Sequence, residues 1–489
     1  MCGVQSMVGL MRALIHVWNA RSLKDFGVLA FVLCTVFFSS SCKQGEDFKA
    51  PQFAGKDAWA SELAGGEVLQ ERWWQRFESR QLDALVERAL ADNPDLEQSL
   101  ARVQFARAQL GVDRSAQWPQ LALKGGTQWE RISGSVFGAN LPPGVPLPAL
   151  QRDRWQGLLS LNYEFDFWGR VARQREASQA RVLGMEARVA AQRLSVVAEL
   201  AAQFVQLCSL DAQLAVLKRA IALRADALSL QESRRAAGLA NDLEAERART
   251  EWQLARADLQ EVIRQRARVA NGIAVLCGAS PAELVLPAQS MLPKLPLPKR
   301  PLPATLLLRR PDLRAAAAQL QEAQARIGVA RADFLPRFVL VANGGFDSVG
   351  AQDFLDWRSR AASLGPQIDL PLFQGGRLRA QLQAAQANHA AELAGWRKAL
   401  LIALQEVENA TVDWQSMQRQ IEASSAALEA ASKAESLARL RHDKGLASYF
   451  EVVDAQRVVL STELALKQIE GAQVVAAVQL LRALGGGWQ

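Results

Sequence analysis

Cysteine, histidine and paired carboxylates are the side chains of this sequence that could do chemistry, and their spacing excludes most of it. The cysteines and histidines are Cys2, Cys34, Cys42, Cys208, Cys277, His16, His389 and His442. They form neither a CxxC pair nor a Cys/His cluster, so no zinc site is expected. There is no GxSxG, no HExxH and no phosphate loop, and the helical carboxylates pair with arginines four residues away, as on ordinary surfaces. The patterns predict neither an enzyme nor a cofactor.

Cys42 is the exception, because a targeting segment leads up to it. An apolar run, FGVLAFVLCTVFF at 26–38, follows scattered basic residues and is too short for a comfortable membrane span. Small residues directly before Cys42 look like a bacterial lipobox, with Ser39 where leucine is usual. This predicts a lipoprotein signal peptide over 1–41 and a covalent lipid, diacylglycerol and N-palmitoyl, on Cys42. In the alternative, ordinary signal cleavage leaves Cys42 incidental.

The elements that follow this anchor occur twice. NPDL at 93–96 matches RPDL at 310–313 at an offset of 217 residues, and GLA at 238–240 matches GLA at 445–447 at an offset of 207. Two constant offsets indicate a duplication. The extra residues of the first half lie in a Pro/Gly-rich insertion at 133–148, which is expected to be an exposed loop.

The duplication defines the expected domain organisation. We predict a signal peptide at 1–41, an extended segment at 42–78, a first repeat at 79–290, a Pro-rich linker at 291–303 and a second repeat at 304–489. Each repeat is expected to begin with a helix, at about 79–115 and about 310–333, that stops before a proline.

A pair of strands is expected after each of these helices, at about 120–168 and about 337–371. The clearest strand, WQGLLSLNYEFDFW at 155–168, alternates apolar and polar residues. Its length fits a membrane-spanning β-strand with one face toward lipid and one toward water. Four strands cannot close a barrel with a lumen, since the smallest transmembrane barrels need about eight, whereas three chains would supply twelve. The alternative is a soluble sandwich with one wet face.

A long helical hairpin is expected after each strand pair. No proline lies between Gly169 and Gly238, and a continuous helix of that length would reach roughly 100 Å. Gly238 and Gly445 are expected to end the outgoing helices, and Asn241 or Ser448 to cap the returning ones. Apolar residues recur at coiled-coil spacing in the first half and in part in the second: Ala180, Leu183, Ala187, Ala190, Leu194, Val197, Ala201 and Phe204, then Ala387, Ala390, Ala394, Leu401 and Leu404.

Four stretches closely resemble the TolC-like outer-membrane factors, above all their lipoprotein branch, often called OprM- or NodT-like. They are WWQRFESRQLDALVERALADNPDL at 73–96, NYEFDFWGR at 162–170, LLLRRPDLRAAAAQLQEAQARIGVARADFLP at 306–336 and LRALGGGW at 481–488. The resemblance runs from about residue 50 to the end. It implies an α+β membrane protein: a homotrimer whose twelve-stranded outer-membrane β-barrel, with four strands per chain, continues into a long α-helical coiled-coil barrel in the periplasm.

The same resemblance implies a function and partners. The chain would be the lipid-anchored outer-membrane channel of a tripartite efflux system, exporting drugs or other small toxic compounds by passive conduction. Its partners would be two further copies, a periplasmic adaptor (membrane fusion) protein, an inner-membrane pump of the RND or ABC type, and outer-membrane lipid.

Two sets of site residues follow from the resemblance. The tips Gly238, Leu239, Gly445 and Leu446 match the family's adaptor-contacting turns; from the residues alone, plain helix termination is an equal alternative. Glu451 and Asp454 match acidic residues that line the closed periplasmic aperture, where threefold symmetry would make rings that attract cations. From the sequence alone they are a solvated helix face. His442 and Ala447 stand where the family often has tyrosine and sometimes arginine, so the gate contacts are expected to differ.

Two other classes of protein compete with this interpretation. The net charge of +7 comes from basic residues interleaved with acidic ones, without interleaved aromatics, so nucleic-acid binding is not expected. A structural coiled-coil scaffold of the envelope would explain the heptads and the signal but not the alternating strands. A scaffold should be extracted without detergent, whereas a channel should require it.

Overall fold

The computed structural model describes residues 43–50, 72–133, 150–238, 241–289, 292–293 and 308–486. They belong to two compact units: unit 1 contains residues 1–49, 106–182 and 320–392, and unit 2 contains residues 50–105, 183–319 and 393–489. Several predicted features lie outside the described residues: the signal peptide at 1–41, Cys42, Leu239, the loop at 133–148 from residue 134 on, and the linker at 291–303 apart from residues 292 and 293.

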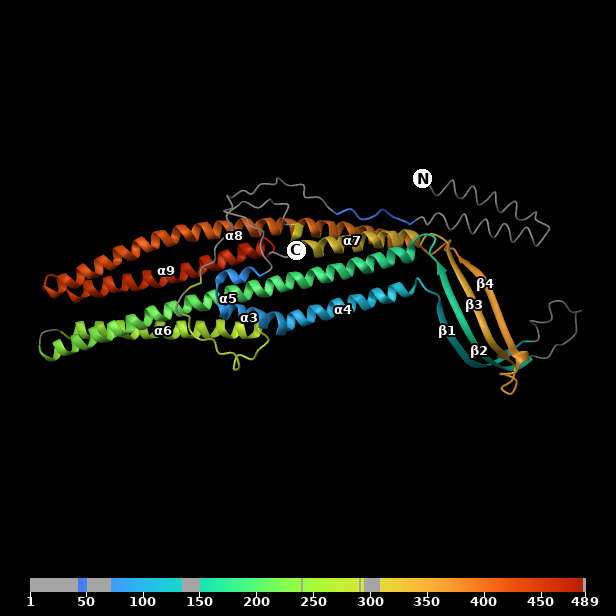
Figure 1. The fold of residues 1–489 in the computed structure, drawn as a ribbon, viewed down its shortest axis with the longest axis horizontal. Coiled ribbons are helices and arrows are strands. Elements are labelled where there is room, and N and C mark those ends of the chain that lie inside the picture. Colours follow the sequence, from blue (N-terminus) through green and yellow to red (C-terminus); the bar gives the residue numbers. More distant parts are fainter. Residues whose placement is uncertain are drawn as a thin grey trace, which may run out of the picture. The chain divides into compact units, whose positions relative to one another are not determined.

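Unit 1 is built around one antiparallel sheet with the strand order β1-β2-β3-β4 (Figure 1). The strands are β1 (Gln120–Ile132), β2 (Leu150–Phe165), β3 (Arg337–Ser348) and β4 (Arg360–Asp369). The two halves of the chain meet where β2 pairs with β3, for example at Ser160 opposite Asn343. Among the described residues, β1 pairs only with β2 and β4 only with β3, so both edges of the sheet are open.

The two faces of this sheet differ in chemistry, as the alternation in the sequence predicts. On one face Ser160 donates a hydrogen bond to Asn343 at 2.6 Å, and Asn343 donates one to Ser363 at 3.1 Å, so a polar ladder crosses three strands. The other face presents leucine and isoleucine side chains that expose between 46% and 78% of their surface: Leu121, Leu123, Leu159, Leu364 and Ile368. Monomeric soluble proteins rarely expose so continuous an apolar surface.

The helical hairpins of the two halves have equal lengths. The outgoing helices α5 (Arg170–Ala236) and α8 (Arg377–Asp443) have 67 residues each, and the returning helices α6 (Asp242–Leu276) and α9 (Tyr449–Ala483) have 35 each (Figure 1). Shorter helices come before the strand pairs: α3 (Arg80–Asp92), α4 (Pro94–Ser115) and α7 (Pro311–Ala332).

The prediction of one helix at about 79–115 is wrong, because the chain breaks at Asn93. Pro94 has no N–H and forces the preceding residue out of the helical conformation, so Asn93 is extended and ends α3. The Asn93 side chain then begins α4 by accepting a hydrogen bond from the Leu96 N–H at 3.1 Å. It also donates to the Leu276 carbonyl at 2.8 Å, which ties this break to the end of α6.

The core of unit 2 surrounds the middle of α5. Leu200, Phe204 and Leu207 of α5 are at most 1% exposed, and Trp73 and Leu82 belong to the same cluster. The predicted first-half seam is largely confirmed, since six of its eight residues are buried, with Leu183 exposed: the six are Ala180, Ala187, Leu194, Val197, Ala201 and Phe204.

The predicted second-half seam is not buried within the single chain. Ala387, Ala390, Ala394 and Leu401 are exposed, and Leu404 is half-buried. A different stripe of α8, comprising Ala403, Val407 and Ala410, is buried against α7 and α9. Two apolar stripes with similar spacing compete on this helix, and tertiary packing selects the one that meets Leu313 and Leu480.

One helix among the described residues, α5, contains an 18-residue window apolar enough to cross a membrane. Within the protein, 67% of that window is buried. Such burial is typical of a core helix, which agrees with the place of α5 in the core.

Candidate functional sites

Both hairpins turn at a glycine in the left-handed conformation. The φ angle is +73° at Gly238 and +70° at Gly445, a region that glycine adopts without the steric penalty of a side chain. The Gly445 N–H donates to the His442 carbonyl and the Leu446 N–H to the Arg441 carbonyl, both at 2.8 Å, which closes the last turn of α8. Leu446 exposes 69% of its surface, so the second tip presents an apolar side chain to solvent.

The returning helices begin differently at the two tips. Asn241 precedes α6, and its side-chain oxygen accepts a hydrogen bond from the Glu244 N–H at 3.0 Å. Ser448 precedes α9 but makes no such bond with its side chain. The predicted cap is therefore confirmed at Asn241, whereas Ser448 occupies the capping position without capping.

Glu451 and Asp454 lie three residues apart at the start of α9, and both are exposed. Val452 and Val453, between them in sequence, are buried. Glu451 is 3.7 Å from Arg441 of α8, in an ion pair whose side chains are about half exposed, so the pair contributes little to stability. Within one chain both carboxylates therefore face solvent.

His442 connects the two hairpins near their tips. Its Nε2 lies 3.3 Å from Nη1 of Arg234 on α5, and its Nδ1 lies 3.2 Å from the Ala447 carbonyl. Arginine can only donate and a carbonyl can only accept, so the tautomer that suits both contacts accepts at Nε2 and donates from Nδ1. The imidazole also lies 5.7 Å from the ring of Tyr449 between centroids. His442 thus links α5 to α8 and α9.

A buried ion cluster further along the hairpins was not predicted. Glu251 of α6 is 5% exposed and accepts a hydrogen bond from Arg457 Nε of α9 at 2.7 Å. Arg224 of α5 donates to the Glu251 carbonyl at 2.8 Å, and its guanidinium lies 3.4 Å from the carboxylate. Burial lowers the pKa of Arg224, whereas the hydrogen bond to Glu251 raises the pKa of Arg457. One carboxylate therefore joins both helices of the first hairpin to the second.

The signal for this cluster is present in the sequence. The buried residues of α6 follow one stripe, which Glu251 shares: Ala245, Ala248, Glu251, Ala255 and Val262. A carboxylate on an apolar stripe must be paired, because an isolated buried charge is strongly unfavourable. Arg457 could not be identified as its partner from spacing, since it lies 206 residues away.

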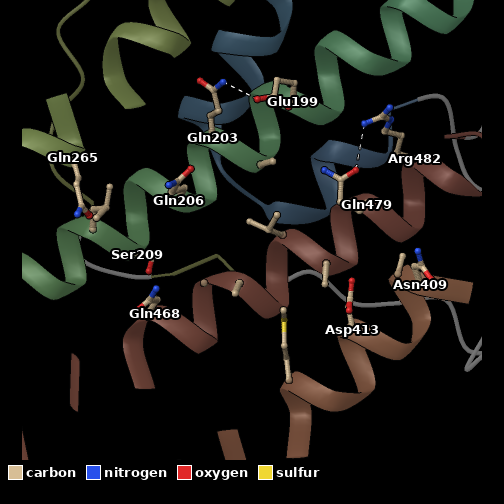
Figure 2. Close-up of a pocket in the computed structure, with 18 of the residues that line it drawn as sticks. Glu199, Gln203, Gln206, Ser209, Gln265, Asn409, Asp413, Gln468, Gln479 and Arg482 are labelled. Carbon is tan, nitrogen blue, oxygen red and sulfur yellow. Dashed lines mark hydrogen bonds between the residues drawn. The ribbon is translucent and has the colours of Figure 1, made fainter. Parts of the chain in front are cut away.

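Unit 2 also contains a cavity of about 760 Å³ whose lining is rich in carboxamide groups (Figure 2). Figure 2 shows Gln203, Gln206, Gln468 and Gln479 among the side chains around it. Gln203 donates to Glu199 at 2.8 Å. The lining residues include neither histidine nor cysteine. Carboxamides both donate and accept hydrogen bonds, and carboxylates accept them, so the cavity suits water and polar solutes rather than covalent chemistry.

The described residues offer neither a metal site nor a reactive thiol. Among the described residues, no group of three or more histidine, cysteine, aspartate or glutamate side chains could hold a metal ion. Cys208 and Cys277 are buried free thiols, and burial raises the pKa of Cys208 to about 12 and also raises that of Cys277. Both thiols are therefore expected to be unreactive.

Comparison with known proteins agrees with this geometry. The family model described as outer membrane efflux protein matches residues 85–279 and again residues 302–486. The chain is 30% identical over 468 residues to the outer membrane protein OprJ of Pseudomonas aeruginosa, with 95% of this chain and 96% of the relative covered. It is 31% identical over 419 residues to the toluene efflux pump outer membrane protein TtgI of Pseudomonas putida, with 84% and 86% covered.

A solved structure extends the likeness to the fold. The outer-membrane channel OprN superposes with a TM-score of 0.82 at 30% identity, covering 91% of this chain and 100% of that chain. The prediction of an α+β outer-membrane protein with duplicated strand pairs and helical hairpins is thereby confirmed.

Proposed function

Because the chain belongs to the outer membrane efflux protein family and is the outer-membrane component of an efflux system, we propose that three copies form one duct for passive export of small molecules. The sheet of unit 1 carries this proposal. Its edges at β1 and β4 are open, one face is apolar and exposed, and the other bears the polar ladder. Unpaired backbone groups cost several kcal/mol each in lipid, so both edges need partners from neighbouring copies. Three four-stranded sheets give twelve strands around a polar lumen.

Neighbouring residues of β4 provide a matched test of this barrel. Leu364, on the apolar face, is 76% exposed, whereas Ser363 belongs to the polar ladder. Arginine on a lipid-facing position costs about 2–4 kcal/mol near the membrane centre, while lumen positions tolerate it. Leu364→Arg should abolish the heat-modifiable trimer on gels, and Ser363→Arg should preserve it. Equal tolerance of both changes would rule out a lipid-facing role for this face.

The hairpin tips are proposed to dock a periplasmic adaptor protein. The argument rests on Leu446, an apolar side chain exposed at a turn closed by backbone hydrogen bonds, beside Gly445. Gly238 and Leu239 would act in the same way at the first tip. Replacement of Leu446 by serine should leave the trimer intact and reduce binding of purified adaptor, because a helical hairpin docks through apolar contacts. Undiminished binding would assign Leu446 to helix termination alone.

Glu451 and Asp454 are proposed to form the periplasmic gate. In a trimer each exposed carboxylate would become a ring of three like charges, which attracts cations at a constriction. The double variant Glu451→Ala/Asp454→Ala should raise leak conductance or lower cation selectivity in planar bilayers. Unchanged conductance and selectivity would remove these residues from the gate.

Cys42 is proposed to carry diacylglycerol and N-palmitoyl groups that anchor the mature chain in the outer membrane. Mass spectrometry of the mature N-terminus tests this directly, and an unmodified terminus at another residue would refute it.

The polar groups of the unit 2 cavity suit the passage of hydrated solutes rather than a catalytic step. We therefore propose that the chain needs no cofactor.

The cargo is proposed to be drugs or other small toxic compounds, delivered by an inner-membrane pump of the RND or ABC type. TtgI, a relative over most of this chain, is named for toluene efflux. Deletion of the gene should increase sensitivity of the host to such compounds, and complementation should restore resistance. Unaltered sensitivity to a broad panel of them would count against this cargo class.

A further inference from the structure

The first described segment of the chain, residues 43–47, is held through its backbone. The Gln44 N–H donates to the Trp168 carbonyl at 3.1 Å. Arg173 donates to the carbonyl of Gln44 at 2.8 Å and to the carbonyl of Gly45 at 2.6 Å. Three backbone hydrogen bonds therefore hold this segment, in addition to the contacts of its side chains.

Arg173 is unusual for a cationic side chain because it is almost completely buried. Only 1% of the residue is exposed, and its guanidinium also pairs with Glu176 at 2.8 Å and with Asp47 at 3.1 Å. Lys43 approaches Glu176 at 2.7 Å from the other side. A buried guanidinium needs its donors satisfied, and residues of the N-terminal segment supply three of its partners.

Glu176 forms ion pairs with both Lys43 and Arg173 and so helps to hold the N-terminal segment. Burial alone would raise its pKa, but the hydrogen bonds from Lys43 and Arg173, together with their charges, hold the pKa below its usual value. Glu176 is therefore ionised at neutral pH and pairs with both cations.

Two glycines make room for the segment. Gly45 has a φ of +85°, and a Cβ there would come within 3.2 Å of the Gly328 Cα. A Cβ on Gly328 would meet the Gln44 carbonyl oxygen and the Arg173 Cγ at 2.9 Å. The 2.9 Å contacts at Gly328 are shorter than real Cβ atoms make, whereas the 3.2 Å contact at Gly45 is tight and adds to the strain of its left-handed backbone. The fit therefore depends most strongly on the absence of a side chain at Gly328.

We propose that Gly169, Arg173, Glu176, Gln324 and Gly328, here named the N-terminal seat, bind residues 43–47 and thereby fix the lipid anchor at the helix-facing end of the sheet. The seat combines the start of α5 in the first repeat with the end of α7 in the second, so the bound segment also ties the two repeats together. Gln324 contributes by donating to the Glu46 carbonyl at 3.5 Å. The inference about the anchor rests on the proposed lipidation of Cys42.

The seat lies next to Cys42 in sequence, so only a short stretch of chain would separate the proposed lipid from the sheet. Lys43 lies close to Gly169, where a Cβ would come within 3.0 Å of the Lys43 Cα, and Gly169 follows β2 by four residues. Cys42 is bonded directly to Lys43 in the sequence. Acyl chains on Cys42 would therefore enter the bilayer beside the sheet. If the segment left the seat, the acyl chains could enter the bilayer at a variable distance from the sheet.

Trypsin cleavage after Lys43 tests the seat in the full-length membrane-embedded protein. The parent carries Lys49→Gln, which removes a competing cleavage site, and is compared with Gly328→Ala and Arg173→Lys. Overpacking at Gly328 should displace the segment and accelerate cleavage at Lys43 by about five- to a hundred-fold. Arg173→Lys should act in the same direction, because one ammonium cannot replace the forked guanidinium at two carbonyls and two carboxylates.

Gly111→Ala is the matched control, since this helical glycine of unit 1 has open space around it and cleavage should change by less than about twofold. Far-ultraviolet circular dichroism and gel migration of the trimer verify folding of each variant; if Gly328→Ala fails to fold, Arg173→Lys decides. Cleavage in folded variants at the parent rate would overturn the seat, as would rapid cleavage of the parent. The mass of the released N-terminal peptide separately reports the lipid, so an unlipidated peptide refutes the anchor without affecting the cleavage rates.

Discussion

Helices α5 and α8 have the same length and the same place in the two repeats, yet they are buried to very different degrees. α5 contains 22 buried apolar residues and α8 contains five. On α8, Leu401, Val412 and Leu437 expose 66%, 55% and 60% of their surface. Amphipathic helices normally bury their apolar stripe, so we infer that further copies of the chain cover α8. Duplication has produced one helix that is buried in the core of the chain and another that is largely exposed within the single chain.

The returning helices differ in a complementary way. Glu251 of α6 aligns with Val458 of α9 at the repeat offset of 207 residues. The carboxylate is 5% exposed, and the valine is 48% exposed. A charge inside and an apolar side chain outside is the reverse of the usual order, and it is stable only because Arg224 and Arg457 pair with Glu251.

The largest expected effect is therefore the loss of charge at Glu251. Glu251→Gln leaves Arg224, whose side chain is 10% exposed, without its carboxylate. Removal of one partner from a buried ion pair destabilises a protein by about 3–5 kcal/mol. The free energy of unfolding should be measured by guanidinium titration of detergent-solubilised protein, followed by circular dichroism.

Val458→Gln is the control for this comparison. Because Val458 is half exposed and lies outside the ion cluster, it should change the unfolding free energy by less than about 0.5 kcal/mol. Equal effects at both positions would mean that the cluster contributes nothing specific to the packing of the two hairpins.

A somewhat smaller effect is expected from truncation of apolar side chains on the two outgoing helices. Leu207 of α5 is 0% exposed, so Leu207→Ala should destabilise the chain by about 2–5 kcal/mol. Leu401→Ala on α8 should leave the unfolding of the single chain within about 0.5 kcal/mol of the parent but weaken the trimer. Gel migration at increasing temperature measures the trimer. A trimer as heat-resistant as the parent would place the interface of α8 elsewhere.

The same contrast shows what could be predicted from the sequence. The strand alternation around Ser160 and the glycine turns at Gly238 and Gly445 are local signals, and the structure places both features where they were expected. The failures involve partners distant in sequence. Periodicity on α8 could not show that Ala403 rather than Leu401 would be buried, because both stripes have coiled-coil spacing and only tertiary packing selects between them.

The candidate sites show the same difference between local signals and partners that are distant in sequence. Gly445 and Leu446 follow from a turn and its neighbour, so they could be named from the sequence. Glu251 and Arg173 were missed because each is buried by partners far along the chain, at Arg457 and at residues 44–47. The helical break at Asn93 was a local error, since Pro94 had already indicated it.

The smallest expected effect separates the two tips. Asn241→Ala removes the hydrogen bond to the Glu244 N–H and should destabilise the start of α6 by about 1 kcal/mol. Ser448→Ala removes no side-chain hydrogen bond at the same position of α9, so it should change stability by less than about 0.5 kcal/mol. Amide hydrogen exchange in the first turns of α6 and α9 resolves the two changes. If Ser448→Ala accelerates exchange as much as Asn241→Ala does, Ser448 caps α9 in solution and the tips are equivalent. If only Asn241→Ala does so, α9 begins without a side-chain cap next to Glu451 and Asp454, and the start of the proposed gate helix is the more easily opened of the two.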